Sequence, residues 1–228
     1  MRSSGQNRSK KPGYLYHILP FHYLVEIFEN QALSLSCPKS WDDPYESVLD
    51  VGILDSIFAQ CWCRLGVSDA MWRIYSKDQL SVRIKTTVPR LRAELETALS
   101  KDDRFTWRMG TVDYQPTPRV KNTVRQHLTA LGATGDAKHA LDSLFIKRKA
   151  FEHEAEYRIA VFSRHPLRDK PRLTFSVNAH RIILSVLVDP RAPDRAVNVY
   201  KYYLKSKLAF RGPVGKSELY ARVEPPEV

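Results

Sequence analysis

The sequence has no long hydrophobic run. Its longest nearly continuous apolar stretch, Ile182 to Val188, is interrupted by Ser185, whereas a membrane-spanning helix needs about 20 apolar residues. This excludes a transmembrane protein. The basic, polar residues 1–13 lead into no apolar signal core, and so nothing in the sequence indicates export. We therefore expect a cytoplasmic protein with no membrane partner.

Cysteine and glycine are also scarce. The three cysteines, Cys37, Cys61 and Cys63, are an odd number in a chain of 228 residues, which argues against a disulfide framework and is typical of a reducing compartment. One residue separates Cys61 from Cys63, which is shorter than the usual zinc spacing, and no second Cys/His pair follows. We expect core thiols and no metal. The nine glycines form neither a GxGxxG nor a GxxxxGK[ST] loop, which excludes nucleotide binding by a Rossmann or P-loop route.

Positive charge is in excess. The chain has 36 Lys and Arg against 25 Asp and Glu, a net charge of +11, to which residues 1–12 contribute four basic side chains. Eight basic and three acidic residues lie between positions 106 and 150, beside Trp107, Tyr114 and Phe145. Cations release counterions from phosphates and aromatic rings stack on bases, so this stretch favours a nucleic-acid partner. A solvated helix surface in a basic protein explains it equally well.

The apolar pattern predicts an α+β protein. Residues 1–12 lack large apolar side chains and are predicted to be a flexible arm, which leaves one domain over residues 13–228. Two helices separated by Gly132 and Gly135 form a predicted helical insert at about residues 118–149. The remaining periodic segments predict strands at residues 14–19, 32–36, 56–63, 80–86, 107–114, 156–162, 172–177, 182–188 and 217–223. They also predict a short helix or turn at 69–75 and helices from residues 21, 89 and 193.

Two segments offer residues for chemistry near predicted element ends. His17 lies at the end of an aromatic strand just before a helix, where its imidazole could face a cleft, although a structural histidine is the simpler interpretation. Trp72 and Tyr75, in the segment Met71-Trp72-Arg73-Ile74-Tyr75, could form a platform for a planar ring. Core packing is the alternative for these two rings.

A third segment carries glutamates at every second position. If Glu156 begins a strand, alternation places Tyr157 on the buried face and Glu156 with Arg158 on the other. Glu152 and Glu154 would then compete with Glu156 for one side, and at least one of the three should occupy a functional or paired position. The alternative is a surface pair between Glu156 and Arg158, worth less than about 1 kcal/mol.

Together these segments resemble a widespread bacterial family of unknown function. The resemblance extends from about Tyr14 to Tyr220. It consists of the sequences Leu15-Tyr16-His17, SCPKSWDDPYE from Ser36, MWRIY from Met71, EAEYR from Glu154 and KSELY from Lys216. The chain departs from the family pattern at Leu19, Ile74, Phe151 and His153. That family is in turn distantly similar to the ADP-ribosyltransferase superfamily, which includes DNA-targeting bacterial toxins.

The resemblance implies a split β-sheet core with a helical insert, which grips NAD as a substrate and needs no metal. It implies catalytic roles for three residues: His17 would hydrogen-bond the dinucleotide, Tyr75 (or Trp72) would stack on nicotinamide, and Glu156 would hold a ribose hydroxyl. A carboxylate beside the ribose would stabilise oxocarbenium charge in the transition state. The implied cofactor-binding set is His17, Trp72, Tyr75, Tyr16 and Arg158.

The resulting hypothesis is an enzyme that transfers ADP-ribose from NAD to a macromolecular acceptor such as nucleic acid. The chain would act as a toxin or phage-defence effector, with an antitoxin or defence protein as a partner. One alternative is a non-catalytic module of the same fold that binds nucleic acid or protein. Another is a hydrolase in which Glu156 and His153 or His17 act as acid and base on a phosphodiester.

Overall fold

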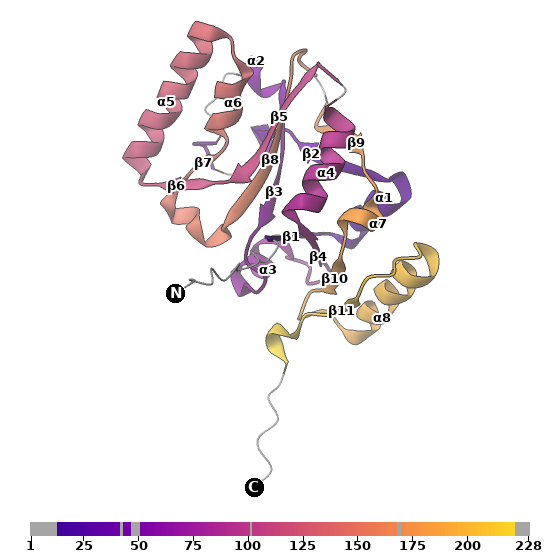
Figure 1. Ribbon diagram of the computed structural model, residues 1–228. Helices are drawn as coiled ribbons and strands as arrows, with labels where there is room; N and C mark the ends of the chain where they lie inside the picture. The colour runs from indigo at the N-terminus through magenta and orange to yellow at the C-terminus, as the bar shows by residue number, and fades with distance from the viewer. Residues whose placement is uncertain (1–12, 42, 47–50, 101, 168–169, 222–228) are drawn as a thin grey trace, which may run out of the picture.

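The computed structural model describes residues 13–41, 43–46, 51–100, 102–167 and 170–221 (Figure 1). The predicted arm at residues 1–12 lies outside this part of the chain. Within it, nine strands form one mixed sheet in the order β11-β10-β4-β1-β3-β2-β9, with β8 pairing both β3 and β5. These strands are β1 (Tyr14–Leu19), β2 (Ala32–Ser36), β3 (Ile57–Cys63), β4 (Val82–Thr87), β5 (Phe105–Thr111), β8 (Glu156–Ser163), β9 (Arg172–Ser176), β10 (Ser185–Val188) and β11 (Val214–Lys216).

The helices alternate with these strands along the chain, so the predicted α+β class is confirmed. They are α1 (Phe21–Asn30), α2 (Val51–Leu54), α3 (Asp69–Tyr75), α4 (Val88–Leu99), α5 (Thr117–Thr134), α6 (Ala137–Ser143), α7 (Ala179–Ile182) and α8 (Asp194–Tyr202). The helical insert is present as α5 and α6. It lies between two short strands, β6 (Asp113–Gln115) and β7 (Ile146–Arg148), which pair in parallel.

The sheet is split at β3. This strand pairs with β8 along its whole length, from Ile57 to Cys63. Its other edge pairs with β1 only at Cys63, opposite Tyr16, and with β2 only at Ala59, opposite Ser36. Strands β1 and β2 therefore diverge from one another along β3, and between them the edge of the sheet is open.

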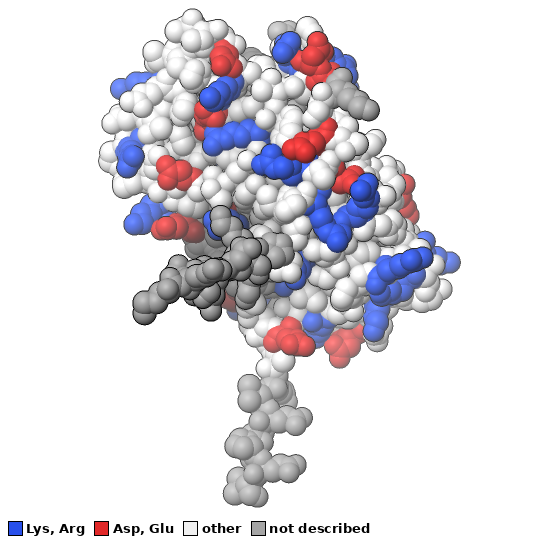
Figure 2. All heavy atoms as spheres, viewed as in Figure 1, with Lys and Arg blue, Asp and Glu red and all other residues white. Residues whose placement is uncertain are grey.

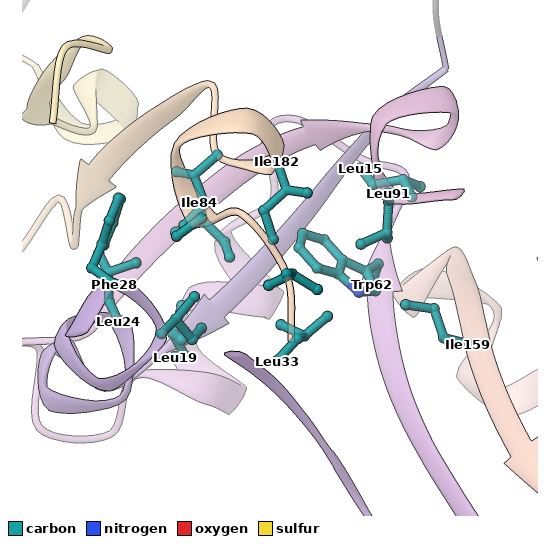
Figure 3. Packing of buried hydrophobic residues seen from close by; sticks show 14 of the residues in the cluster. Leu15, Leu19, Leu24, Phe28, Leu33, Trp62, Ile84, Leu91, Ile159 and Ile182 are labelled. Atoms are coloured by element: carbon teal, nitrogen blue, oxygen red, sulfur yellow. The ribbon is translucent and has the colours of Figure 1, made fainter. Parts of the chain in front are cut away.

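Helices cover both faces of the sheet (Figure 1). The larger core joins α1, α4 and α7 to one face, where Leu15, Leu33, Trp62 and Ile84 are at most 1% exposed. Figure 3 shows Trp62 at the centre of this packing. A smaller core holds α6 and α2 against β3 and β8 on the other face. Burial of these apolar side chains is the main force that holds the layers together.

Local signals explain where several helices begin and end. Thr87 caps α4, because its hydroxyl accepts a hydrogen bond from the backbone N–H of Arg90, which replaces a bond that the helix start lacks. Helix α1 ends at Gln31, whose left-handed φ of 46° lets its N–H reach the carbonyl of Ile27. The Gln31 side chain then donates to Phe28 O at 2.6 Å and accepts from Ala179 N at 3.0 Å, which ties α1 to α7.

Three predicted elements differ from the structure. The strand predicted at residues 182–188 begins only at Ser185, because Asn178 caps the short helix α7 and draws Ile182 into it. The segment predicted at 107–114 is divided into β5 and β6, since β5 pairs with β8 and β6 with β7. The predicted final strand is wrong over Glu218–Tyr220, which forms a 3-10 turn, while residues 222–223 lie outside the described residues.

Candidate active site

A cavity of about 820 Å³ lies where β1 and β2 diverge, and residues from β1, β2, β3, α3 and β8 line it. The structure brings His17, Tyr75 and Glu156 to the wall of this one cavity. The other members of the predicted cofactor-binding set, Tyr16, Trp72 and Arg158, line it as well. Residues that are 139 positions apart in the sequence thus face a common space.

Strand register explains how the two ends of the chain meet here. Tyr16 lies opposite Cys63 in the β1–β3 pair, and Cys63 lies opposite Glu156 in the β3–β8 pair. The three residues therefore form a row across neighbouring strands. Two interstrand spacings of about 4.8 Å place Tyr16 and Glu156 about 10 Å apart along this row.

His17 bridges the opening in the sheet. Its Nδ1 lies 2.9 Å from the backbone carbonyl of Cys61 on β3. Because a carbonyl only accepts hydrogen bonds, Nδ1 carries the proton, and in the neutral ring Nε2 is an acceptor. Burial lowers the pKa of His17 to about 4, although the bond to Cys61 opposes this shift. Near neutral pH, His17 is therefore an uncharged ring with an acceptor nitrogen.

Helix α3 supplies the two aromatic rings. Ser68 caps this helix by accepting a hydrogen bond from Met71 N at 3.3 Å. Trp72 is 1% exposed and packs in the protein interior, whereas Tyr75, at the last turn, is 43% exposed. Core packing therefore accounts for Trp72, and Tyr75 is the ring that offers a free surface.

Glu156 belongs to a buried group of five charged residues, which we name the ion-pair cluster: Glu46, Lys147, Glu154, Glu156 and Arg158. Lys147 Nζ lies 2.6 Å from Glu156, 2.9 Å from Glu154 and 3.5 Å from Glu46. Arg158 Nε donates to Glu156 at 2.5 Å, and the same guanidinium forms an ion pair with Glu46. All five residues are at most 8% exposed, and so the cluster is largely shielded from water.

Burial and charge act in opposite directions on the carboxyl groups of the cluster. Burial alone would raise the pKa of Glu156, but Arg158 and Lys147 hold it below its ordinary value. Burial raises the pKa of Glu154 to about 7, because Lys147 compensates only in part. Glu156 is therefore ionised at neutral pH, whereas Glu154 titrates close to it. This separation of two neighbouring carboxyls is typical of acid–base sites.

The cluster corrects the expectation of a surface pair between Glu156 and Arg158. Both faces of β8 are covered, because β8 lies between β3 and β5 with helices on each side. Arg158 is 1% exposed, stacks 4.6 Å from the Trp41 ring and donates to Leu144 O at 2.6 Å. These partners and the carboxylates occupy its guanidinium. Arg158 therefore holds Glu156 in place and need not contact a cofactor directly.

Arg83 on β4 is a cavity residue that the sequence patterns did not reveal. Its guanidinium lies 5.0 Å from the Tyr16 ring and 5.8 Å from the Trp72 ring, and it donates to Gly66 O. Within the described chain, no carboxylate forms an ion pair with Arg83. Burial lowers the pKa of Arg83, and the groups that oppose this shift are Tyr16 and Cys63. A partly buried cation without an acidic partner is a binding point for an anion.

Sequence reasoning also missed Lys147 and Glu46 as site residues, and it did not single out Glu154 from its neighbouring glutamates. Glu46 was visible in the quoted motif that ends in Pro44-Tyr45-Glu46, and Glu154 precedes Glu156 in the EAEYR segment. The sequence places Lys147 among the eight basic residues between positions 106 and 150. Its burial depends on β7, whose pairing with β6 points Lys147 toward β8.

Two of the three cysteines lie at or near the cavity. Cys63 is buried, and Cys61 is partly buried and lines the cavity. Burial raises the pKa of the Cys61 thiol well above its ordinary value, so it is not a thiolate nucleophile at neutral pH.

Among the helices of the described segments, none has both the length and the apolar character needed to span a bilayer.

Basic side chains of the insert divide into two groups. Arg108 forms an ion pair with Asp142, Arg148 one with Asp43 at 3.0 Å, and Lys147 lies in the ion-pair cluster. By contrast, Arg119, Lys121, Arg125, Lys138 and Lys149 are exposed. On the face shown in Figure 2, Lys and Arg are interspersed with Asp and Glu and form no single basic field.

The predicted resemblance to a family of unknown function is confirmed over part of the chain. A family model described as "Protein of unknown function (DUF2971)" matches residues 71–159. This range contains Tyr75, Lys147, Glu154, Glu156 and Arg158. Tyr16 and His17, which lie on β1, precede it. No curated protein matches the sequence.

Two solved structures are similar to this chain over most of its length, and both are of DarT from Thermus sp. 2.9. The structure in complex with ADP-ribosylated ssDNA has 11% identity and a TM-score of 0.44, and the match covers 92% of this chain and 96% of that one. The structure in complex with carba-NAD+ has 12% identity and a TM-score of 0.42, with coverage of 92% and 97%. At these scores the similarity does not support a functional assignment. Such an assignment has to rest on the residues of the cavity.

Proposed function

We propose that this protein binds NAD in the cavity at the split of the sheet and transfers ADP-ribose to a macromolecular acceptor. The observation that carries the proposal is that His17, Tyr75 and Glu156 line one cavity. Its volume of about 820 Å³ is at the upper end of the range for ligand pockets, about 300–1,000 Å³, which suits an extended dinucleotide.

The charges in the cavity complement those of NAD. Arg83 supplies a cation without an acidic partner in the described chain, and it suits the diphosphate. The ion-pair cluster has three carboxylates and two cations, so with every group ionised it carries one negative charge. This end suits the positively charged nicotinamide ring. Tyr75, with 43% of its surface exposed, offers an aromatic face that attracts such a cation.

The proposed reaction breaks the bond between nicotinamide and the ribose C1 atom. Nicotinamide leaves with the bonding electron pair, and positive charge develops on the ribose. Ionised Glu156 stabilises that charge more strongly in the transition state than in bound NAD. A nitrogen or oxygen of the acceptor forms the new bond to C1 and releases a proton. Glu154, with its pKa raised to about 7, is suited to accept this proton.

Nucleic acid is the acceptor that we propose. The exposed cations of the insert, including Arg119, Lys121 and Arg125 on α5, can contact phosphates without occupying the cavity. Such contacts position a strand but provide no sequence specificity. Enzymatic modification of nucleic acid would harm the cell, and so a toxin or phage-defence effector controlled by an antitoxin fits this activity. The thiol state of the cysteines fits a cytoplasmic setting.

The central experiment measures NAD binding and nicotinamide release by the wild type and by Glu156→Gln. We expect calorimetry to detect NAD binding in both proteins, because Gln keeps the shape of the side chain. Nicotinamide release and the transfer of labelled ADP-ribose to single-stranded or double-stranded oligonucleotides should be lost in Glu156→Gln. Glu152→Gln is the matched control, since Glu152 is exposed and lies in the same segment.

Three outcomes distinguish the hypotheses. If the wild type gives no heat with NAD, the NAD proposal is wrong. If NAD binds but no oligonucleotide is labelled, nucleic acid is not the acceptor. Salt-dependent oligonucleotide binding without any response to NAD would favour the non-catalytic module. Thermal unfolding of Glu156→Gln shows whether a lost activity reflects lost folding, and Tyr75→Ala provides a second test outside the ion-pair cluster.

A further inference from the structure

Two histidines and an aspartate gather on the helical insert, away from the active-site cavity. His127 lies on α5, and His139 and Asp142 lie one turn apart on α6. Each residue offers one ligand atom, and these atoms all lie within 4.8 Å of one another. All three side chains are partly buried, and none of them lines the cavity that holds His17 and Glu156.

The hydrogen bonding of this group is incomplete. His139 Nδ1 is buried and has no hydrogen-bond partner among the described residues, although a buried polar atom is normally paired. Arg108 forms an ion pair with Oδ1 of Asp142, and no described residue forms a hydrogen bond with Oδ2. His127 and Asp142 also line a second cavity, of about 680 Å³. The group therefore combines unpaired ligand atoms with space beside them.

We propose that His127, His139 and Asp142 bind a zinc ion that links α5 to α6. Two imidazoles and one carboxylate are a common ligand set for zinc, with a fourth, open position for water. Imidazole nitrogen distinguishes this set from the all-oxygen sites that magnesium and calcium prefer. Zinc–ligand bonds of about 2.0–2.1 Å require the ligand atoms to approach to about 3.3 Å. Rotation of partly buried side chains can provide this approach.

The surroundings support the ligands. Arg108 stacks 4.1 Å from the Phe145 ring while it holds Asp142, and so it orients the carboxylate as an outer partner of a metal site. Asp136 caps α6 by accepting from Lys138 N at 2.9 Å, and Gly135 closes α5 with a left-handed φ of 67°. The turn between the helices is thus fixed, and it keeps His127 facing α6.

No sequence pattern indicates this site, because eleven residues separate the two histidines and Asp142 lies on a different helix from His127. Only the antiparallel packing of α5 on α6 brings the three together. The expectation of no metal rested on Cys61 and Cys63, and the zinc proposal involves neither. The site is independent of the proposed transfer of ADP-ribose.

The experiment titrates zinc chloride into tag-free, chelator-treated full-length protein by calorimetry. We expect one zinc ion per chain and a higher melting temperature with zinc. His127→Gln and His139→Gln should each weaken binding at least tenfold. His165→Gln is the matched control, because His165 is an exposed histidine outside the group. Cobalt in place of zinc should give the visible absorption of a four-coordinate site in the wild type, and this absorption should be lost in the two variants.

Two results would overturn the proposal. One is the absence of zinc binding by the wild type, and the other is unchanged affinity in both His127→Gln and His139→Gln, which would place the zinc elsewhere, for example on the cysteines. The melting temperatures of the metal-free variants serve as the folding control. NAD binding by these variants should equal that of the wild type, which keeps the test separate from the proposed enzyme activity.

Discussion

Replacement of Lys147 by methionine tests whether the ion-pair cluster holds the site together. Lys147 touches three carboxylates, those of Glu46, Glu154 and Glu156. Without it, Arg158 still pairs with Glu46 and Glu156, whereas Glu154 keeps no ion pair among the described residues. Removing one partner of a buried ion pair typically costs about 3–5 kcal/mol, because the other charge stays buried without compensation. For a chain of this length, that loss corresponds to a decrease of about 6–20 °C in melting temperature.

The assay is thermal and urea unfolding at pH 8 and pH 5. We expect the larger loss at pH 8, because at pH 5 Glu154 is protonated in the folded protein and less negative charge is left unpaired. The double variant Lys147→Met, Glu154→Gln should recover part of the loss, since it removes one of the competing carboxylates. Arg104→Met is the control. Its ion pair with Asp102, at 2.6 Å, involves an Arg104 side chain that is 63% exposed, and such pairs contribute less than about 1 kcal/mol.

Two results would refute this reasoning. If the melting temperature of Lys147→Met decreases by no more than that of Arg104→Met, the buried cluster does not stabilise the fold through Lys147. If the loss is the same at pH 5 and pH 8, the unpaired carboxylates are not its cause. In either case Lys147 would no longer explain how Glu156 is kept ionised, and Arg158 would remain as its cationic partner.

Three further predictions concern single groups in the cavity. The pKa of His17 is lowered from 6.5 to about 4, so the free energy of unfolding should decrease as the pH falls from 6.5 to 4. Urea unfolding of His17→Gln should show a smaller decrease over the same pH range. The pKa of Glu154 is raised from 4.5 to about 7, which means that the stability it contributes is present below pH 4.5 and is lost as the pH rises through 7. Glu154→Gln should therefore gain stability relative to the wild type at pH 8, with little difference at pH 4; the opposite sign would contradict the direction of the shift. Arg83→Met should weaken NAD binding about tenfold or more in calorimetry and leave nicotinamide binding unchanged, if Arg83 binds the diphosphate.

The sequence predicted most of the secondary structure because the apolar periodicity of the strands and helices is strong. Strands β1, β2 and β3 and helix α3 lie where the pattern placed them, to within one residue, and α1 begins at the predicted residue. The errors concern short elements. Helix α7 has four residues, and β7 and β11 have three each, which is too few for a period to emerge. Their positions depend on a capping Asn178 and on pairing with distant strands.

The candidate site was only partly visible in the sequence. His17, Tyr75 and Glu156 came from the resemblance to a known family, and the structure places them at one cavity. Arg83 could not be predicted, because in an alternating strand it has the pattern of an ordinary surface residue. Lys147 has the same difficulty: its charge suggested the surface, whereas its 6% exposure results from three carboxylates that reach it from other segments. Alternation can indicate which residues share a face, but it does not reveal which distant side chains neutralise them.

The cavity and the orientation of His17 share one topological cause. A strand that paired with β3 along its full length would take up the backbone groups of Cys61 in a ladder. Because β1 and β2 meet β3 at one residue pair each, the Cys61 carbonyl remains available to His17, and the space beside it remains open. The bond to Cys61 in turn fixes the proton on Nδ1 and leaves Nε2 as an acceptor. Divergence of two strands therefore creates the cavity and also sets the protonation of the histidine that faces it.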